Sequence, residues 1–269
     1  MSEAAAQMLA TKIRKTILTQ SKRANVGHIG SCLSIADILA VLYGGAIRFT
    51  SPDDEDRDRL VLSKGHAALA LYGALNAVGV IDDDLLETFC TNGSALGTHP
   101  EHVVAGIDFS TGSLGHGLSY ACGAALAARM QNSGRRVFAI VSDGECNEGA
   151  LWESVMFAAH HRLSNLTAIV DMNGQQAFGY TRDVLDLSPL ENKWEAFGWD
   201  VRSVGGHDHA ALESALSDAA HGDAPHVVIA ATTFGKGVSF MENQIIWHYW
   251  PMTDDHFRNA IAELEAQEA

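Results

Sequence analysis

The sequence predicts an α/β fold in which a mostly parallel sheet is flanked by helices on both faces. The first observation is a short apolar run over 137–141 that stops at a polar turn, Ser142-Asp143-Gly144. A helical pattern over 148–162 and a second apolar run over 166–170 follow it. A strand, a crossover helix and a parallel strand form a right-handed unit in nearly all proteins. The second observation is that such runs alternate along the rest of the chain, which is typical of this fold class.

The N-terminal third is predicted to be mainly helical. Residues 3–23 fit an amphipathic helix, and we expect its buried stripe to be Met8, Ile13, Ile17 and Leu18. A glycine-flanked turn at His28 leads into a helix that continues to Leu42. A charged turn over 52–59 precedes a short strand over 60–62 and a helix that extends to Leu75, which Ser63 is expected to cap. A further helix is expected over 82–89.

The rest of the chain continues the alternation. A turn of small residues over 110–117 opens a helix over 118–130. Beyond the central unit we expect a polar loop over 175–181, helices over 189–197 and 209–220, strands over 199–204 and 226–232, and a terminal helix over 254–266. His207 and His209 are expected in a solvated turn. Because no repeat or linker interrupts the pattern, the sequence predicts a single domain over 1–269.

Composition excludes several classes of protein. A chain of 269 residues that is 47% hydrophobic can bury a substantial core. Its mean hydropathy of +0.01 and its lack of long apolar runs argue against a membrane span, and the first residues do not form a secretion signal. The four cysteines are widely separated, which argues against a zinc or disulfide framework and suits a reducing cytoplasm. A net charge of −15 makes nucleic acid an unsuitable partner.

Two polar residues follow the two central strands. Because the carboxyl ends of parallel strands meet at one edge of a sheet, we expect Asp143 and Asn173 to lie side by side. Carboxylate and amide oxygens suit Mg²⁺, which takes its other ligands from water and phosphates. The alternative is that Asp143 caps a helix and Asn173 occupies a turn. Gly144 and Gly174, which follow the pair, favour a metal site over these separate roles.

The surrounding segment resembles the thiamine diphosphate motif of transketolases. The matching residues are Asp143-Gly144, Glu148-Gly149, Trp152-Glu153, Asn165-Leu166, Asp171-Met172-Asn173 and Gly179. The resemblance implies a thiamine diphosphate-binding fold and a metal held by Asp143, Asn173 and the backbone carbonyl of Gln175. Mg²⁺ is the expected ion, with another divalent cation such as Ca²⁺ or Mn²⁺ as the alternative. The sequence departs from the family at Ser142, where glycine is usual.

A second segment, Thr111-Gly112-Ser113-Leu114-Gly115-His116-Gly117, resembles the family's Thr-Gly-x-Leu-Gly-x-Gly turn. A small-residue turn before a helix allows close backbone approach to an anion. His116 stands where the family commonly has glutamine. The resemblance implies that the cofactor contacts His66, Gly112, Ser113, Leu114, Gly115, Asp143, Gly144, Glu145, Asn173 and His248.

Four histidines are candidate catalytic residues. His28, His66 and His99 lie in turns that resemble the family's Gly-His-x-Gly, Ser-x-Gly-His-Ala and Gly-His-Pro segments, and His248 follows the last strand. A single histidine between glycines is commonly a surface turn residue, but core packing does not explain three such turns. The resemblance implies that the four histidines transfer hydroxyl protons or stabilise developing charge.

The resemblance implies an enzyme, the N-terminal subunit of a transketolase. Such an enzyme transfers a two-carbon ketol unit, a glycolaldehyde group, from a ketose or ketose phosphate to an aldehyde acceptor. The family's pyrimidine-binding domain, which carries the glutamate that activates the cofactor, has no counterpart in this chain. We therefore expect a separate C-terminal subunit that supplies this glutamate, in a heterotetramer with two copies of each chain.

Three alternatives remain open at this point. A thiamine diphosphate-dependent subunit that decarboxylates 2-oxo acids, similar to deoxyxylulose-phosphate synthase or the α subunit of 2-oxo acid dehydrogenases, shares the cofactor. A split transketolase with an unusual acceptor is the second alternative, and a non-catalytic cofactor-binding scaffold is the third. The turns at His28 and His99 favour ketol transfer. The sequence leaves the donor and acceptor sugars open.

Overall fold

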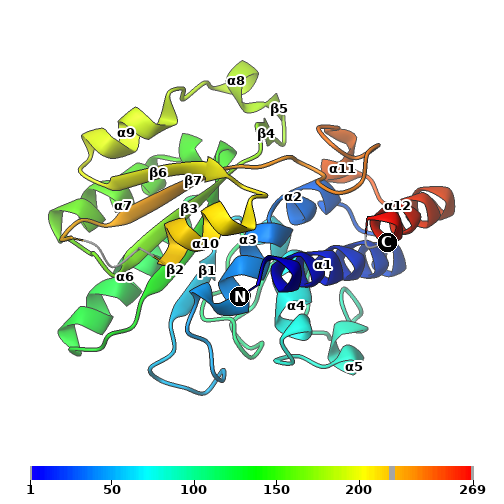
Figure 1. Cartoon of the computed structure of the whole chain (residues 1–269), viewed down its shortest axis with the longest axis horizontal. Coiled ribbons are helices and arrows are strands. Elements are labelled where there is room, and N and C mark those ends of the chain that lie inside the picture. The colour runs from blue at the N-terminus through cyan, green and yellow to red at the C-terminus, as the bar shows by residue number, and fades with distance from the viewer. Residues whose placement is uncertain (1, 218–221, 268–269) are drawn as a thin grey trace.

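The computed structural model describes residues 2–217 and 222–267. Its centre is a five-stranded sheet with the order β1-β2-β3-β7-β6, and every neighbouring pair is parallel (Figure 1). The strands are β1 (Arg59–Leu62), β2 (Val137–Ser142), β3 (Leu166–Met172), β6 (Asp200–Gly205) and β7 (His226–Ala231). The predicted fold class, a parallel sheet with helices on both faces, is confirmed.

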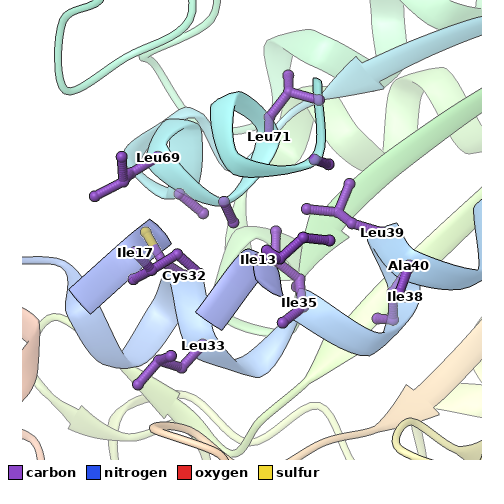
Figure 2. Packing of buried hydrophobic residues seen from close by; sticks show 14 of the residues in the cluster. Ile13, Ile17, Cys32, Leu33, Ile35, Ile38, Leu39, Ala40, Leu69 and Leu71 are labelled. Atoms are coloured by element: carbon purple, nitrogen blue, oxygen red, sulfur yellow. The ribbon is translucent and has the colours of Figure 1, made fainter. Parts of the chain in front are cut away.

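One face of the sheet is covered by six main helices. They are α1 (Glu3–Ala24), α2 (Ile29–Ser34), α3 (Ala36–Val41), α4 (Ala68–Ala77), α10 (His209–Ser217) and α12 (Asp254–Ala266). Their apolar side chains form one continuous core with alternate strand residues such as Phe138 and Ile140. Figure 2 shows Ile13 and Ile17 of α1 packed between α4 and the α2–α3 segment.

The opposite face packs against α6 (His116–Met130), α7 (Gly149–His160) and α9 (Leu190–Ala196). The intervening strand residues, Val137, Ala139 and Val141, point into this second core. Because side chains alternate between faces and both faces are buried, β2 has a continuous apolar sequence. A continuous apolar run of this kind is typical of a parallel strand covered by helices on both faces, which is why this arrangement could be predicted from the sequence.

Short elements connect these layers. They are the π-helical turn η1 (Leu42–Ala46), the 3₁₀ turns η2 (Gly65–Ala67) and η3 (Gly144–Asn147), the helices α5 (Asp83–Leu86), α8 (Thr181–Val184) and α11 (Ile246–Tyr249), and the strands β4 (Gln175–Gln176) and β5 (Gly179–Tyr180). The predicted polar loop over 175–181 thus contains an antiparallel hairpin. The helix predicted over 209–220 is seen to Ser217, and 218–220 lie outside the described residues.

Two local predictions are wrong. Met8 is 67% exposed, whereas the other predicted residues of the stripe, Ile13, Ile17 and Leu18, are buried; Ala6 and Ala10, not Met8, continue the stripe toward the N-terminus. Ser63 does not cap a helix. Its hydroxyl donates a hydrogen bond to Glu145 Oε1 at 2.5 Å, a partner 82 positions away that no local pattern indicates.

The prediction of a solvated turn at His207 and His209 is also wrong. His207 Nδ1 and His209 Nε2 lie 2.7 Å and 2.8 Å from the carboxylate of Asp37, and the side chain of His209 is only 6% exposed. Arg14 contacts the same carboxylate with both terminal nitrogens. A carboxylate on α3 buried under α1 and α10 needs several donors, and these histidines supply two of them.

Two expectations drawn from composition can be compared with the structure. Within residues 2–217 and 222–267, no helix is long and apolar enough to cross a bilayer. All four cysteines are free thiols; Cys32, Cys122 and Cys146 are buried and Cys90 is exposed.

Candidate functional site

The turns at the carboxyl edge of the sheet surround a cavity of about 460 Å³. It lies where the segments after β1, β2, β3 and β7 meet α2, as expected for a parallel sheet. The predicted site residues that line this cavity are His28, His66, His99, Gly112, Leu114, Gly144, Asn173, Gln175 and His248. Four predicted site residues do not line it: Ser113, which is exposed, and the buried residues Gly115, Asp143 and Glu145.

Asp143 lies beside the loop that carries Asn173. The register pairs Ser142 with Asp171, and Asp143 N donates to Asp171 O at 3.2 Å. The carboxylate of Asp143 accepts hydrogen bonds from Gly144 N and Gly174 N, both at 2.8 Å. Asp143 lines a second cavity of about 70 Å³ and not the larger cavity that Asn173 and Gln175 line. Ser142 simply ends the strand, so serine at this position fits an extended backbone.

The environment of Asp143 suits a divalent cation. The residue is 7% exposed, and its hydrogen bonds come from backbone amides and from the hydroxyl of Thr181, so none of these partners carries a positive charge. Burial, together with the negative charge of Asp171, raises the pKa of Asp143 to about 7. A bound cation would neutralise the negative charge of this carboxylate and favour its ionised form.

The other oxygen donors are also buried. Asn173 is 6% exposed and Gln175 is 5% exposed, and the side-chain amide of Gln175 has no hydrogen-bond partner among the described residues. Among all residues that the structure describes, no group of three or more histidine, cysteine or acidic side chains is arranged to hold a metal. A metal here would therefore use a mixed set of carboxylate, amide and backbone oxygens, which is typical of Mg²⁺.

Three of the histidines form a compact cluster. The ring centroids of His28, His66 and His248 lie 5.2–5.5 Å apart, and His99 lines the same cavity. Burial, followed by the charges of neighbouring histidines and Lys64, lowers the pKa of all three, to about 4 for His248. They are therefore neutral near pH 7, when an imidazole can both donate and accept a hydrogen bond.

The backbone holds His28 in an unusual conformation. His28 precedes α2 with φ 61°, in the left-handed region, and its N–H donates to His248 O at 3.0 Å. A Cβ at Gly27 would lie 2.5 Å from Tyr249 O, so only glycine allows the two segments to approach this closely. The Nδ1 atoms of His28 and His248 are buried without a hydrogen-bond partner in the described chain.

Glu145 lies beneath the cavity. Its carboxylate accepts hydrogen bonds from Ser63 Oγ at 2.5 Å, from Gly115 N at 2.6 Å and from Ser142 N at 3.2 Å. Gly115, with φ 86°, immediately precedes α6, and its N–H points to Glu145. Glu145 thus supports the small-residue turn from behind. The resemblance implies that Glu145 contacts the cofactor, and no local sequence pattern indicates its hydrogen bond with Ser63.

The buried residues Lys64 and Asp171 were not predicted as functional residues. Their side chains form an ion pair of 2.5 Å with no exposed area, directly behind Asn173 and His66. The sequence did contain a clue to their role. Each is a charged residue next to an apolar strand, within a segment that resembles a transketolase motif. His116, by contrast, is exposed on the first turn of α6 and does not line the cavity.

Comparison with known proteins identifies the family. The thiamine diphosphate-binding domain of transketolase matches residues 5–267. The chain belongs to the transketolase family. It is 41% identical over 267 residues to the 6-deoxy-6-sulfo-D-fructose transketolase subunit of Clostridium sp. (strain MSTE9), and the match covers 98% of this chain and 97% of that protein. It is similar to the apulose-4-phosphate transketolase subunit of Phocaeicola vulgatus, with 37% identity over 261 residues, 96% of this chain and 93% of the relative.

Solved transketolases have the same fold. The transketolase from Leishmania mexicana superposes with a TM-score of 0.91 at 29% identity, and the match covers 98% of this chain. It covers only 42% of that longer chain. This transketolase chain therefore corresponds to the thiamine diphosphate-binding part of the enzyme, and the predicted family, enzyme class and organic cofactor are confirmed. Relatives of matching length are named as subunits, which implies a partner subunit for enzymes of this kind.

Proposed function

We propose that this chain is the N-terminal subunit of a two-chain transketolase that moves a two-carbon ketol unit from a ketose to an aldehyde. We further propose that Asp143, Asn173 and the carbonyl of Gln175 hold Mg²⁺, or Ca²⁺ or Mn²⁺, which binds the cofactor diphosphate. The observation that carries the metal proposal is the buried carboxylate of Asp143 beside the loop of Asn173. Among the described residues, the groups that donate hydrogen bonds to this carboxylate are all uncharged. Thiamine diphosphate, once bound, supplies the carbanion chemistry.

The chain's own side chains position and protonate the substrate. His28, His66 and His248 are neutral at pH 7 and share one cavity with His99. The imidazole rings of His28 and His248, which line the cavity, can exchange protons with substrate hydroxyl groups or donate to a developing alkoxide. Gly112, Ser113, Leu114 and Gly144 are proposed to contact the cofactor.

The substrate is proposed to be a ketose with an anionic group that the partner subunit holds. The relatives' names specify a sulfo sugar and a sugar phosphate. None of the described residues that line the cavity is a lysine or an arginine, so this lining offers the anion no lysine or arginine charge. The proposed partner is a C-terminal subunit that carries the pyrimidine-binding domain and the activating glutamate, two copies of each chain forming a heterotetramer. A single domain and a cytoplasmic location stay predictions.

Turnover measurements test the division into subunits. The chain purified alone should be inactive, and addition of the C-terminal subunit encoded in the same source should restore ketol transfer from a ketose phosphate. Pyruvate should not replace the ketose. Efficient turnover by the isolated chain, or a preference for pyruvate, would contradict the proposal.

Calorimetry with thiamine diphosphate tests the metal site. Asp143→Ala in the assembled enzyme should remove the dependence of cofactor affinity on Mg²⁺. Asp58→Asn is a matched control, because Asp58 is a buried, arginine-bound carboxylate that precedes β1 at the opposite end of the sheet. An unchanged cofactor affinity in Asp143→Ala would refute the site.

A further inference from the structure

We propose that Asp171 is a positioning residue for the metal site, and that it holds the Asn173 side chain with its carbonyl oxygen turned toward the cation. The inference rests on the proposed metal site, and it assigns a role to the buried ion pair of Asp171 and Lys64. Neither residue lines the cavity. Asp171 therefore acts through Asn173 and does not touch the ligand.

The orientation of the Asn173 amide is fixed from both ends. Asn173 Nδ2 donates to Asp171 Oδ2 at 2.8 Å, and Asn173 Oδ1 accepts from Gln175 N at 2.9 Å. An ionised carboxylate only accepts hydrogen bonds and a backbone N–H only donates, so a flipped amide would lose both bonds. The carbonyl oxygen has two lone pairs, and Gln175 N uses one. The second lone pair remains for a metal ion.

The Asp171 carboxylate is itself held firmly. Its Oδ2 accepts from Lys64 Nζ at 2.5 Å and from Ser34 Oγ at 2.8 Å, and its Oδ1 accepts from Thr232 Oγ1. These donors come from three segments: the turn after β1, helix α2 and the turn after β7. Asp171 and Lys64 have no exposed surface. Asn173 thus takes its orientation from an anchor in the sheet, although it belongs to a turn.

The same network reaches a catalytic candidate. Lys64 Nζ also donates to Ser31 O at 3.0 Å, and Ser31 Oγ lies 2.8 Å from His66 Nε2. The ion pair therefore lies between the metal turn and the histidine cluster. Core stability alone is a weak reason for a buried ion pair, because apolar residues of similar volume often stabilise a fold equally well. Orientation of Asn173 gives the carboxylate a task that an apolar residue does not perform.

The experiment compares two double variants that both lack the ion pair. Lys64→Met/Asp171→Asn keeps an acceptor for Asn173 Nδ2, whereas Lys64→Met/Asp171→Leu has a side chain of similar size with no acceptor. Both are assembled with the complementing subunit. Thiamine diphosphate affinity is measured by calorimetry over a series of Mg²⁺ concentrations, and bound Mn²⁺ is counted by electron paramagnetic resonance. Thermal unfolding without metal or cofactor shows whether the two variants are equally stable.

We expect the divalent-ion affinity of the leucine variant to be about 10–100-fold lower than that of the asparagine variant, the range typical for the loss of a hydrogen bond behind a metal ligand. The metal-free unfolding temperature of the leucine variant should be lower, because Ser34 and Thr232 also lose their acceptor, so ion affinities are compared at a temperature at which both variants are folded. Equal ion affinities would overturn the inference and leave a purely structural role for the pair. If the leucine variant does not fold, Lys64→Met/Asp171→Ser serves the same purpose, because the serine hydroxyl is too short to reach Asn173.

Asp143→Ala, measured in parallel, separates this inference from the metal site on which it rests. If Asp143→Ala leaves Mg²⁺-dependent binding intact, the metal site itself is wrong. If Asp143→Ala removes that binding while the leucine and asparagine variants behave alike, only the role of Asp171 is wrong.

Discussion

Replacement of Asp37 by asparagine should cost much more stability than the loss of an ordinary surface charge. Asp37 contacts both terminal nitrogens of Arg14, and the two side chains are only 4% and 5% exposed. His207 and His209 bind the same carboxylate. Removal of one member of a buried pair leaves an uncompensated charge and costs about 3–5 kcal/mol. For a chain of this size we expect the melting temperature to fall by roughly 6–20 °C.

Calorimetric unfolding and urea titration measure this loss. Asp223→Asn is the control, because Asp223 and Arg162 are 88% and 73% exposed and lie 3.8 Å apart, so its effect should stay within about 0.5 kcal/mol. Addition of Arg14→Met to Asp37→Asn should restore part of the stability, because the buried cation is then gone. A loss below about 1 kcal/mol for Asp37→Asn, or no coupling with Arg14, would refute the reasoning.

The pH dependence gives an independent test of Asp37. Burial alone would raise the pKa of this carboxyl, but the hydrogen bonds from His207 and His209 and the charge of Arg14 hold it well below the usual range. The folded pKa is therefore below the unfolded one, so the stabilisation is complete above about pH 4 and decreases as the pH falls further. The stability difference between the wild type and Asp37→Asn should shrink as the pH falls below 4.

Three further predictions concern the site and its supports. Gly117→Ala should destabilise the fold by about 1–3 kcal/mol in urea titrations, because the new Cβ would lie 2.6 Å from Ser63 Cα. Gly123→Ala on the same helix is the control: its Cβ meets nothing within 4 Å, so the change should be neutral or stabilising. Glu145→Gln should lower the free energy of unfolding by about 1–3 kcal/mol and weaken cofactor binding measured by calorimetry, because the Nε2 group that replaces one carboxylate oxygen would face a backbone N–H. Unchanged stability and unchanged cofactor affinity would contradict the supporting role of Glu145. The imidazole of His248 should titrate near pH 4 by NMR. Because this pKa lies below that of the unfolded chain, the stability should fall as the pH drops from 6.5 to 4. In His248→Asn, stability should depend less steeply on pH over this range.

The parallel sheet and its main helices could be predicted because their signals are local. The apolar run of β2 and the helical spacing of α7 lie within one segment, and the boundaries of α12 agree with the predicted 254–266. The cavity followed from a general property of parallel sheets, since residues after neighbouring strands meet at one edge. The positions of His28, His66, His99 and His248 around one cavity agree with this reasoning.

The errors concern contacts between residues far apart in the chain. Ser63 looked like a helix cap because its partner Glu145 is 82 positions away. His209 looked solvated because Asp37, 172 positions earlier, is what draws it into the core. A charged side chain carries no local mark that tells a solvated residue from one with a buried partner, so only the packed structure distinguishes the two.

The strand order also bears on how the chain is synthesised. Within the described residues β6 pairs only with β7, which leaves the ribosome later. At about 5–20 residues per second, the wait for the intervening segment, which includes α10, is roughly 1–4 s. During this time β6 has an unpaired backbone. Its sequence, which includes Asp200, Arg202 and Ser203, is the most polar of the five strands, and charged edge strands resist pairing with other chains. The charged side chains of β6 thus oppose the pairing of this strand with another chain, while the side of β3 that will pair with β7 is unpaired for the same interval.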